Sequence, residues 1–527
     1  MFQAAILIGI YSYIIFALGL LGLLYKNTII LVTIIFIVSV FLSRKSLLTI
    51  VLHSMVEYTS KIFEINSISK LKKVISKDKL RSLLTFLLLV QIVINLIGAL
   101  APERAFDALW YHLTIPKLYL QSHSIYHIPG GLLYYSDMPK LVEMIYTAAL
   151  AFGSEITAKM IHYFFGVLSL ITIFLLGKKY LSQKTALISV LIFYSNPVVS
   201  WQSTTAFVDL GRTFFEILAL FAFINLLANK QKKWLFLTAL MVGLAVTTKI
   251  LAIFSVVIFS VLLIIFRKSI AELVIFISIS ILIPLPWFIF SLLNTGNPFY
   301  PLFSSIPLPQ GFDFISSLKG FWHSPDPISP IYIIIFPLLL MMISKFKLPF
   351  RVISLYSFLA FIFWLSLPPS AGSRFIMPYL PAFSILSAAV INFFPNKMIQ
   401  KYLILIVVLI SLVTIGYRSQ ANSKYIPVIL GFETRESYLA KNLNFSFGDF
   451  YDVDGYFKNK IKEGDRVLII GSHNLYYVNF PYVHESWLKD TDYYNYVLVQ
   501  NTDLPEKLKS FKKIYENRKT NVKLYSK

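Results

Sequence analysis

The sequence predicts an α-helical polytopic membrane protein with about thirteen transmembrane helices, interfacial helices in its outer loops and a small C-terminal α/β domain outside the cytoplasm. Of its 527 residues, 57% are hydrophobic and 14% are charged, and the mean hydropathy is +0.70. One soluble globule cannot hide that much apolar surface. Apolar windows long enough to cross about 30 Å of hydrocarbon also recur along the whole chain. The expected spans fall near residues 4–25, 28–43, 82–100, 156–176, 185–200, 206–228, 234–248, 250–266, 270–292, 331–344, 352–367, 377–394 and 402–417.

The charge and the cysteine content exclude several classes of protein. The net charge of +22 would suit nucleic acid, yet the lysines and arginines stand between apolar segments, where cytoplasmic loops and anionic lipid headgroups account for them. Membrane lipids, and not nucleic acids, are therefore the expected partners. The absence of cysteine excludes disulfides, thiolate catalysis and cysteine-ligated metals. The first apolar run lacks a basic start and a small-residue cleavage site, so we expect a retained span there.

The basic clusters fall on one side of the membrane if the spans alternate. The excess of positive charge assigns that side to the cytoplasm, with the N-terminus inside, the C-terminal domain outside and the protein in the plasma or inner membrane. The alternation requires residues 139–152 to form a short helix at the outer interface, because they are too few to span comfortably. The clusters are Arg44 to Arg81; Lys178, Lys179 and Lys184; Lys230, Lys232 and Lys233; Arg267 and Lys268; Lys345, Lys347 and Arg351; and Lys397 and Lys401.

The chain divides into three predicted parts. Residues 1–81 contain two N-terminal spans and a basic segment, 44–81, whose helical spacing of apolar residues predicts a helix on the cytoplasmic membrane surface. Residues 82–417 form the membrane domain, with long outer loops at 101–155 and 293–330. The tail, 418–527, is the small α/β domain, with helices expected at 451–461 and 505–515 and strands at 466–470 and 496–500.

Ionisable residues at the outer edge of the bilayer are the candidate functional residues, because such groups are costly beside lipid. Asp107 follows directly on the span at 82–100 and heads this set. The others are His112, Asp137, Lys140, Glu143, Asp209, Arg212, Lys249 and Arg374. A carboxylate can accept the proton of an attacking hydroxyl, and a cation can stabilise negative charge on a departing phosphate. Such chemistry requires no cofactor or metal, and it tolerates a divalent ion.

Several of these residues also have a purely structural interpretation. Asp107, Asp137 and Asp209 stand where an aspartate can cap the helix that follows. Glu103 and Arg104 are expected to form a solvated pair.

The remaining side chains of the set have structural alternatives as well. His112 can be a packed ring at the interface, and Lys249 and Arg374 can be anchors that reach toward the headgroups.

Short motifs follow one another in a fixed order along the chain. The motifs are Phe106-Asp-Ala-Leu-Trp-Tyr-His112, Met138-Pro-Lys-Leu-Val-Glu-Met144, Phe207-Val-Asp-Leu210, Thr247-Thr-Lys-Ile250, Pro286-Trp287 with Thr295-Gly-Asn-Pro-Phe-Tyr-Pro301, and Arg374-Phe-Ile-Met-Pro-Tyr-Leu-Pro381. This ordered set resembles the GT-C superfamily of membrane glycosyltransferases, especially the protein mannosyltransferase and lipid A aminoarabinose transferase type. The resemblance covers about residues 82–395, and the order of the motifs is more specific than any one of them.

The resemblance implies an inverting transfer of a sugar from a polyprenyl phosphate to an acceptor outside the cytoplasm, with little or no need for a metal. It implies that Asp107 acts as the base or positions the acceptor, and that Asp209 is the second acidic site. The residues expected to bind the donor phosphate or the substrates are Lys140, Lys249, Arg374, His112, Asp137 and Glu143.

Two other functions stay open at the level of the sequence. A lipid or solute transporter, or a flippase, would place charges in mid-span and repeat its halves, whereas here charge lies near the ends of the spans. An O-antigen ligase or polymerase would use pyrophosphate donors. Within the resemblance, the lone Asp209 lacks the paired carboxylates of oligosaccharyltransferases, and the two N-terminal spans have no counterpart in the simplest members. The sequence does not identify the sugar, or whether the acceptor is a glycan, a lipid or a protein.

Overall fold

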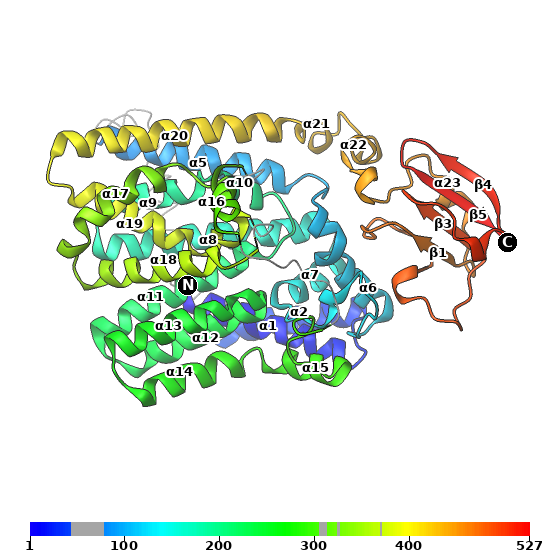
Figure 1. Ribbon diagram of the computed structural model, residues 1–527, viewed down its shortest axis with the longest axis horizontal. Coiled ribbons are helices and arrows are strands. Elements are labelled where there is room, and N and C mark those ends of the chain that lie inside the picture. The colour runs from blue at the N-terminus through cyan, green and yellow to red at the C-terminus, as the bar shows by residue number, and fades with distance from the viewer. Residues whose placement is uncertain (44–77, 305–312, 324–326, 369–371) are drawn as a thin grey trace.

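The computed structural model describes residues 1–43, 78–304, 313–323, 327–368 and 372–527. It shows a long helical bundle with a small β-sheet domain at one end (Figure 1). The expected cytoplasmic helix at 44–81 lies outside the described residues, apart from its last four. Asp78 caps the next helix by accepting a hydrogen bond from the Arg81 amide at 3.1 Å, so residues 79–81 already belong to the span that follows.

The helices of the bundle are α1 (Phe2–Leu20), α2 (Lys26–Ser43), α5 (Lys79–Ala99), α8 (Glu155–Tyr180), α9 (Gln183–Tyr194), α10 (Pro197–Gln202), α11 (Asp209–Asn229), α12 (Lys232–Thr248), α13 (Ile253–Phe266), α14 (Ile270–Leu282), α15 (Leu285–Thr295), α17 (Ile331–Met342), α18 (Leu348–Leu365), α19 (Leu380–Phe393) and α20 (Lys397–Ser423). Short turns connect some of them: η3 (Ile250–Ala252), η4 (Ile343–Lys345), η6 (Ser373–Phe375) and η7 (Met377–Tyr379).

The protein is an integral membrane protein with fewer long apolar helices than expected. Among the described residues, seven helices are long and apolar enough to cross a membrane, and the bent pair α14 and α15, with a 56° angle between them, could supply an eighth. Each of the thirteen expected windows is largely helical, but several of these helices are too short by themselves. The count of thirteen and the orientation in the membrane therefore stay predictions.

The end of the bundle away from the sheet domain gathers segments that the sequence assigns to the cytoplasm. Lys184, before α9, pairs with Asp78 at 3.2 Å. Thr185 hydrogen-bonds Asn392 of α19 at 2.9 Å, and Gln400 of α20 donates to the Asn392 carbonyl at 3.1 Å. The starts of α5 and α9 thus meet the α19–α20 connection at one end, in agreement with the alternation of the spans.

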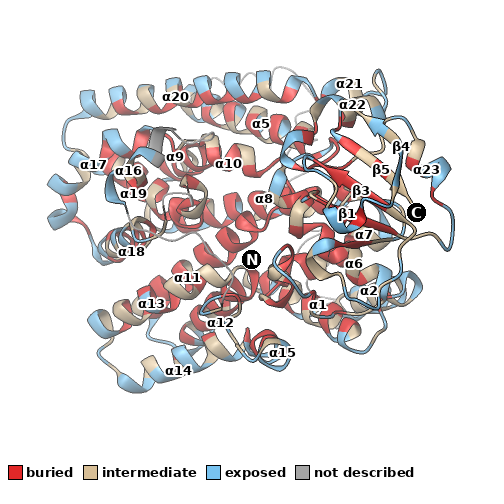
Figure 2. Ribbon diagram, turned by 45° about the vertical axis from the view of Figure 1, so that its right-hand side comes forward, coloured by how far each residue is buried: buried red, intermediate tan, exposed pale blue. Residues whose placement is uncertain are grey.

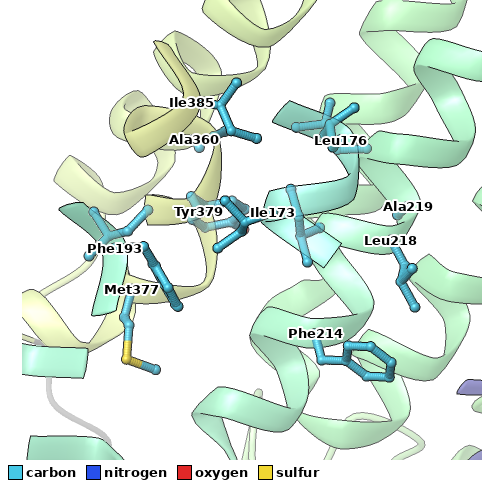
Figure 3. Packing of buried hydrophobic residues seen from close by; sticks show 14 of the residues in the cluster. Ile173, Leu176, Phe193, Phe214, Leu218, Ala219, Ala360, Met377, Tyr379 and Ile385 are labelled. Atoms are coloured by element: carbon cyan, nitrogen blue, oxygen red, sulfur yellow. The ribbon is translucent and has the colours of Figure 1, made fainter. Parts of the chain in front are cut away.

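Helix α11 is the centre of the bundle. Most of its side chains are buried, whereas α14 and α20 expose long stretches of their surface (Figure 2). Apolar residues of α8, α12, α18 and α19 pack around it. Figure 3 shows part of this core, with Phe214, Leu218 and Ala219 of α11, Ile173 and Leu176 of α8, Phe193 of α9, Ala360 of α18, Met377 and Tyr379 of η7, and Ile385 of α19. The first residue of α11 is Asp209, so the most buried helix carries a candidate site residue at its end.

Short outer helices fill the space between the bundle and the sheet domain. They are η1 (Ala108–His112), α6 (Thr114–Ser122), η2 (Tyr134–Asp137) and α7 (Leu141–Phe152). Helix α16 (Phe314–His323) lies instead against α18 of the bundle. The helix expected at 139–152 is confirmed as α7, most of whose surface is buried, whereas its place at the outer membrane interface stays a prediction. Its contacts include α1, α6 and α8, so it is an internal element of the outer layer.

The C-terminal domain contains one five-stranded sheet with the strand order β2-β1-β3-β5-β4. Strand β1 is parallel to β2 and β3, and the pairs β3–β5 and β5–β4 are antiparallel. Its elements are α21 (Ile426–Ile429), α22 (Arg435–Asn442), η8 (Phe445–Phe447), α23 (Tyr456–Lys460), β1 (Val467–Ile470), β2 (Tyr482–His484), η9 (Glu485–Trp487), β3 (Tyr496–Gln500), η10 (Glu506–Leu508), β4 (Lys512–Asn517) and β5 (Val522–Ser526).

Two expected helices of the tail need correction. The helix predicted at 505–515 is wrong, because only η10 is helical and β4 begins at Lys512. Strand β4 is an edge strand with mostly exposed side chains, so it lacks the alternation by which a strand is recognised, and only its pairing with β5 defines it. The helix predicted at 451–461 is confined to α23, since Gly455 has φ +72° immediately before it and interrupts the helical backbone. The strands expected at 466–470 and 496–500 are confirmed as β1 and β3.

Candidate active site

The loop after α5 is fixed by a buried carboxylate. Glu103 is only 1% exposed, and its Oε1 accepts hydrogen bonds from the Arg104 and Ala105 amides, both at 2.8 Å. Its Oε2 accepts from the Ala206 amide at 2.6 Å, just before α11. The expectation of a solvated Glu103–Arg104 pair is therefore wrong. Backbone donors that the turn leaves free satisfy the Glu103 carboxylate, which ties the first outer loop to the start of α11.

Asp107 forms an ion pair with Arg374, which lies in a distant part of the chain. The Asp107 Oδ2 atom accepts a hydrogen bond from Arg374 Nη1 at 2.6 Å, and the Tyr111 hydroxyl donates to the same oxygen at 3.4 Å. Asp107 has helical backbone angles and makes no capping hydrogen bond, so the capping interpretation is wrong for it. Its side chain and that of Arg374 are 20% and 18% exposed, so a ligand can reach both.

Asp209 joins the same group of charges from the first turn of α11. Its Oδ1 accepts a hydrogen bond from Lys249 Nζ at 2.7 Å, and its Oδ2 lies 3.8 Å from Arg374 Nε. Oδ2 is buried and has no hydrogen-bond partner. The order Asp107, Arg374, Asp209, Lys249 alternates in sign, and we call these four residues the charge cluster.

Aromatic rings surround the cations of the charge cluster. The Arg374 guanidinium lies 4.9 Å from the centre of the Phe207 ring and 5.1 Å from that of Phe375, and Lys249 Nζ lies 4.5 Å from the Phe375 ring. Such contacts attract cations and keep their charge away from bulk water. Arg374 and Lys249 are thus held inward by both carboxylates and rings, and the interpretation of either as an anchor that reaches toward headgroups is wrong.

The local environment shifts the pKa values of the charge cluster. Burial favours a higher pKa for Asp107, but the positive charge and the hydrogen bond of Arg374 outweigh it and hold the pKa of that carboxyl below its ordinary value. Burial lowers the pKa of Lys249 to about 8, although the neighbouring Asp209 favours a higher value. Asp107 is therefore ionised at neutral pH, and Lys249 is a cation that titrates just above it.

The remaining candidates form a second group beside the charge cluster. His112 Nδ1 lies 2.9 Å from Glu143 Oε1, and Asp137 Oδ2 lies 2.7 Å from His127 Nδ1. Lys140 is 2% exposed and precedes α7. Asp137 is fully buried, and the helix that follows it, α7, begins after Lys140 without a side-chain cap, so the capping interpretation is wrong for Asp137 as well.

One aromatic ring lies between the two groups. The centre of the Phe207 ring is 5.6 Å from that of His112 and 4.9 Å from the Arg374 guanidinium. The second group leaves polar atoms unpaired, namely His112 Nε2, Glu143 Oε2 and Asp137 Oδ1, all buried. Buried polar atoms normally have a partner, so these three are open to a bound polar ligand or to water. Burial also lowers the pKa of His112, which favours the neutral ring at pH 7.

Sequence reasoning missed His162, which fixes the turn before α11. Its Nδ1 lies 3.0 Å from the Gln202 carbonyl and 2.9 Å from the Thr205 carbonyl, and its Nε2 accepts from the Leu210 amide at 2.9 Å. Since carbonyls only accept, Nδ1 carries the proton and the ring is the neutral tautomer.

Lys159, one turn earlier in α8, was missed as well. It donates to the Gly98 and Ala101 carbonyls at 3.0 and 2.7 Å and so closes the end of α5. Glu155, Lys159 and His162 are spaced by four and three residues, and this polar stripe on one face of an apolar helix was the available signal.

Sequence reasoning also missed Glu216, and this residue corrects the expectation that charge lies only near the ends of the spans. It is the eighth residue of α11 and fully buried, and it pairs with Arg212. Charge is therefore not confined to the ends of the helices.

The described residues contain no group of three or more His, Cys, Asp or Glu side chains that could hold a metal ion.

A family model matches the middle of the chain. Residues 142–289, from α7 to α15, match the model for dolichyl-phosphate-mannose-protein mannosyltransferases. This stretch contains Glu143, Asp209 and Lys249. No curated protein matches the sequence.

Solved structures provide the comparison of folds. ArnT from Cupriavidus metallidurans bound to undecaprenyl phosphate is 12% identical, with a TM-score of 0.59 over 84% of this chain and 97% of that chain. Its apo state is 11% identical, with a TM-score of 0.56 over the same shares of both chains. A third structure is the archaeal oligosaccharyltransferase AglB from Archaeoglobus fulgidus, in complex with an inhibitory peptide and a dolichol-phosphate. It is 12% identical over 81% of this chain and 70% of that chain. Its TM-score of 0.47 is too low to support a shared fold. The partial family match and the shared fold together confirm the predicted resemblance: the chain is similar to the GT-C membrane glycosyltransferases and has their fold.

Proposed function

We propose that this protein is an inverting glycosyltransferase that moves a sugar from a polyprenyl phosphate to an acceptor on the outer side of the membrane. The observation that carries the proposal is the charge cluster, in which two carboxylates alternate with two cations at the end of the bundle beside the sheet domain. Two of its members, Asp107 and Arg374, are partly exposed. The similarity to ArnT, whose structure contains undecaprenyl phosphate, supports this type of donor.

The transfer needs a base on one side of the sugar and cations on the other. The acceptor hydroxyl oxygen attacks the anomeric carbon, and its proton passes to the Asp107 carboxylate. The bond between that carbon and the phosphate oxygen breaks, and the phosphate keeps the electron pair. Arg374 and Lys249 stabilise the negative charge that develops on the phosphate. The attack comes from the face opposite the phosphate, so the configuration at the anomeric carbon inverts.

The ion pair between Asp107 and Arg374 gives donor binding a second effect. Arg374 lowers the proton affinity of Asp107 as long as the two are in contact. A donor phosphate competes for the same guanidinium, because arginine binds phosphate oxygens as well as it binds carboxylates. Movement of Arg374 toward the phosphate would release Asp107 and raise its proton affinity. Asp107 therefore becomes a stronger base once the donor has bound.

A cavity of about 850 Å³ between the outer helices and the sheet domain offers a route for the acceptor. Its walls include Tyr126 and His127 of the first outer loop and Tyr482 and Trp487 of the sheet domain. His127 also contacts Asp137, so the cavity adjoins the second group of candidate residues. Half-exposed rings beside hydrogen-bonding groups suit the hydroxylated part of a glycan or a polar peptide. Lipid chains would instead approach from the membrane side.

The test is transfer by the purified protein in proteoliposomes. The protein is incubated with a panel of radiolabelled undecaprenyl-phosphate sugars and an extract of envelope glycans, and we expect one donor to be consumed with release of undecaprenyl phosphate. An Arg374→Ala protein in the same liposomes provides the background. Consumption of none of the donors would refute the proposal. Movement of the lipid across the bilayer with its sugar intact would indicate a flippase, and consumption of pyrophosphate-linked donors alone would indicate a ligase or polymerase.

A further inference from the structure

Three ionisable residues of α11 share one face of the helix. Asp209, Arg212 and Glu216 are separated by three and four residues, which places them above one another along the helix. Asp209 belongs to the charge cluster, whereas Arg212 and Glu216 lie one and two turns deeper and are 1% and 0% exposed. Nothing in the proposed transfer uses these two residues directly. Charged groups this deep in a membrane helix are costly, so they need a reason.

Arg212 and Glu216 form the centre of a closed hydrogen-bond network. Arg212 Nη2 donates to the Tyr379 hydroxyl at 2.5 Å, and its guanidinium lies 5.1 Å from the centre of the Tyr379 ring. Glu216 Oε1 accepts from Ser255 Oγ at 2.5 Å and from Arg212 Nε at 3.4 Å. Its Oε2 accepts from the Tyr356 hydroxyl at 3.1 Å. The network therefore joins α11, α13, α18 and η7.

The network is complete, unlike the second group of candidate residues. An ion or proton pathway would need open ligand positions, and none of the network's five side chains is among the described ones that leave a buried polar atom unpaired. A satisfied buried network instead rigidifies the elements that it joins.

The element that this network fixes carries Arg374. Tyr379 ends η7, and Arg374 stands five residues earlier in η6, so two tight turns connect them. Met377 and Tyr379 are buried among residues of the neighbouring helices (Figure 3). Since the turns leave little freedom between Tyr379 and Arg374, the position of the tyrosine sets the position of the Arg374 backbone, from which the side chain reaches Asp107 and Asp209. Helix α11 thus holds Asp209 directly and Arg374 through Tyr379.

We propose that Arg212 and Glu216 are positioning residues for Arg374: through Tyr379 they hold the segment 372–379 so that the Arg374 guanidinium lies between Asp107 and Asp209. The catalytic meaning of this position rests on the proposed function, whereas the restraint on the segment does not. Asp107 and Asp209 keep their distances to the Arg374 guanidinium only if η6, which carries Arg374, stays fixed relative to α11. The proposal therefore assigns a role in the site to two charges that do not touch the substrates.

The test uses two conservative variants and a matched control. Tyr379→Phe removes one hydroxyl from the network, and Glu216→Gln removes its negative charge with little change of shape. Tyr332→Phe is the control, because it also removes a buried tyrosine hydroxyl of the bundle, one that hydrogen-bonds Ser384 at 2.8 Å outside the network. The full-length proteins are compared in detergent by hydrogen–deuterium exchange of segment 372–380, by binding of undecaprenyl phosphate and by thermal unfolding.

We expect both network variants to raise the exchange of segment 372–380 and to weaken undecaprenyl phosphate binding by about tenfold, the effect of one buried hydrogen bond. The melting temperature of Tyr379→Phe should fall no further than that of the control, whose exchange at 372–380 and lipid affinity should be unchanged. Glu216→Gln breaks a buried ion pair, so its melting temperature should fall further than that of the control. Unchanged exchange at 372–380 in both variants would overturn the proposal, as would equal changes in the control. If the wild-type protein itself bound no undecaprenyl phosphate, the proposed function would fail, while the exchange measurement would still decide the positioning role.

Discussion

Replacement of Asp107 by asparagine tests whether Asp107 acts as a base or only positions the acceptor. Asparagine keeps the shape and one hydrogen-bond acceptor, so it can still orient a hydroxyl, but it cannot take a proton. Loss of a general base costs about 10²- to 10⁴-fold in rate, or about 3–5 kcal/mol of barrier. We therefore expect the transfer rate to fall at least about 100-fold.

The geometry of the Asp107–Arg374 ion pair sets limits on the free energy of unfolding that Asp107→Asn loses. At 2.6 Å the gross attraction between Asp107 and Arg374 is about 6 kcal/mol for an effective dielectric constant of about 20. Desolvation offsets most of it, and Arg374 keeps Asp209 at 3.8 Å as a second partner. Exposed pairs contribute up to about 1 kcal/mol and broken buried pairs cost about 3–5 kcal/mol. A pair that is 18–20% exposed should lie between these limits, at about 2 kcal/mol.

The assay measures transfer of label from an undecaprenyl-phosphate sugar in proteoliposomes, together with thermal unfolding. Asp313→Asn is the matched control, because the Asp313 carboxylate is exposed and caps the start of α16 through the Ile315 and Ser316 amides. The control should transfer at the wild-type rate. An Asp107→Asn protein that stays folded and keeps more than about a tenth of the wild-type rate would refute the role as a base, since that loss is smaller than any general base would give.

Three further predictions concern other contacts of the structure. Arg374→Ala should weaken undecaprenyl phosphate binding at least about tenfold in a lipid-binding assay, because a charge-assisted hydrogen bond to phosphate is lost, and an equal affinity would contradict the phosphate role. Because the pKa of Lys249 is about 8, its positive charge is lost as the pH rises past that value, so kcat/KM should fall above about pH 8. Lys249→Arg should move that fall to higher pH, and a wild-type profile that is flat to pH 10 would count against the role of Lys249. Arg435→Ala removes the 2.7 Å ion pair between Arg435 Nη2 and the buried Glu155, so trypsin should release the C-terminal domain faster than from wild type; an unchanged rate would show that other contacts hold the domain.

The local pattern of residues was enough for the class of protein and for the inventory of the site. Hydropathy identified an integral membrane protein, because the cost of polar groups in lipid acts on each window of the chain separately. The motif order identified the similarity to GT-C glycosyltransferases. Asp107, Asp209, Lys249 and Arg374 were all named from the sequence, and the structure brings these four together. Their catalytic and binding roles stay predictions.

The sequence alone could not show which residues of the site contact one another, because these contacts join segments that are far apart in the chain. No spacing rule connects Asp107 to Arg374, or Glu216 to Ser255 and Tyr356. Sequence reasoning read Glu103 as a solvated residue for the same reason, since its partner at Ala206 belongs to another loop.

The sheet domain shows the same limit in its secondary structure. Strands β1 and β3 are continuous apolar runs and were expected, whereas the edge strand β4 was read as a helix because only its hydrogen bonds to β5 make it a strand. The sequence alone determined that this chain lies in a membrane and which charged residues it carries near the ends of its helices. The tertiary structure decided which of those charges meet, because the energy of an ion pair depends on distances and burial that only the packing of α11 against its neighbours defines.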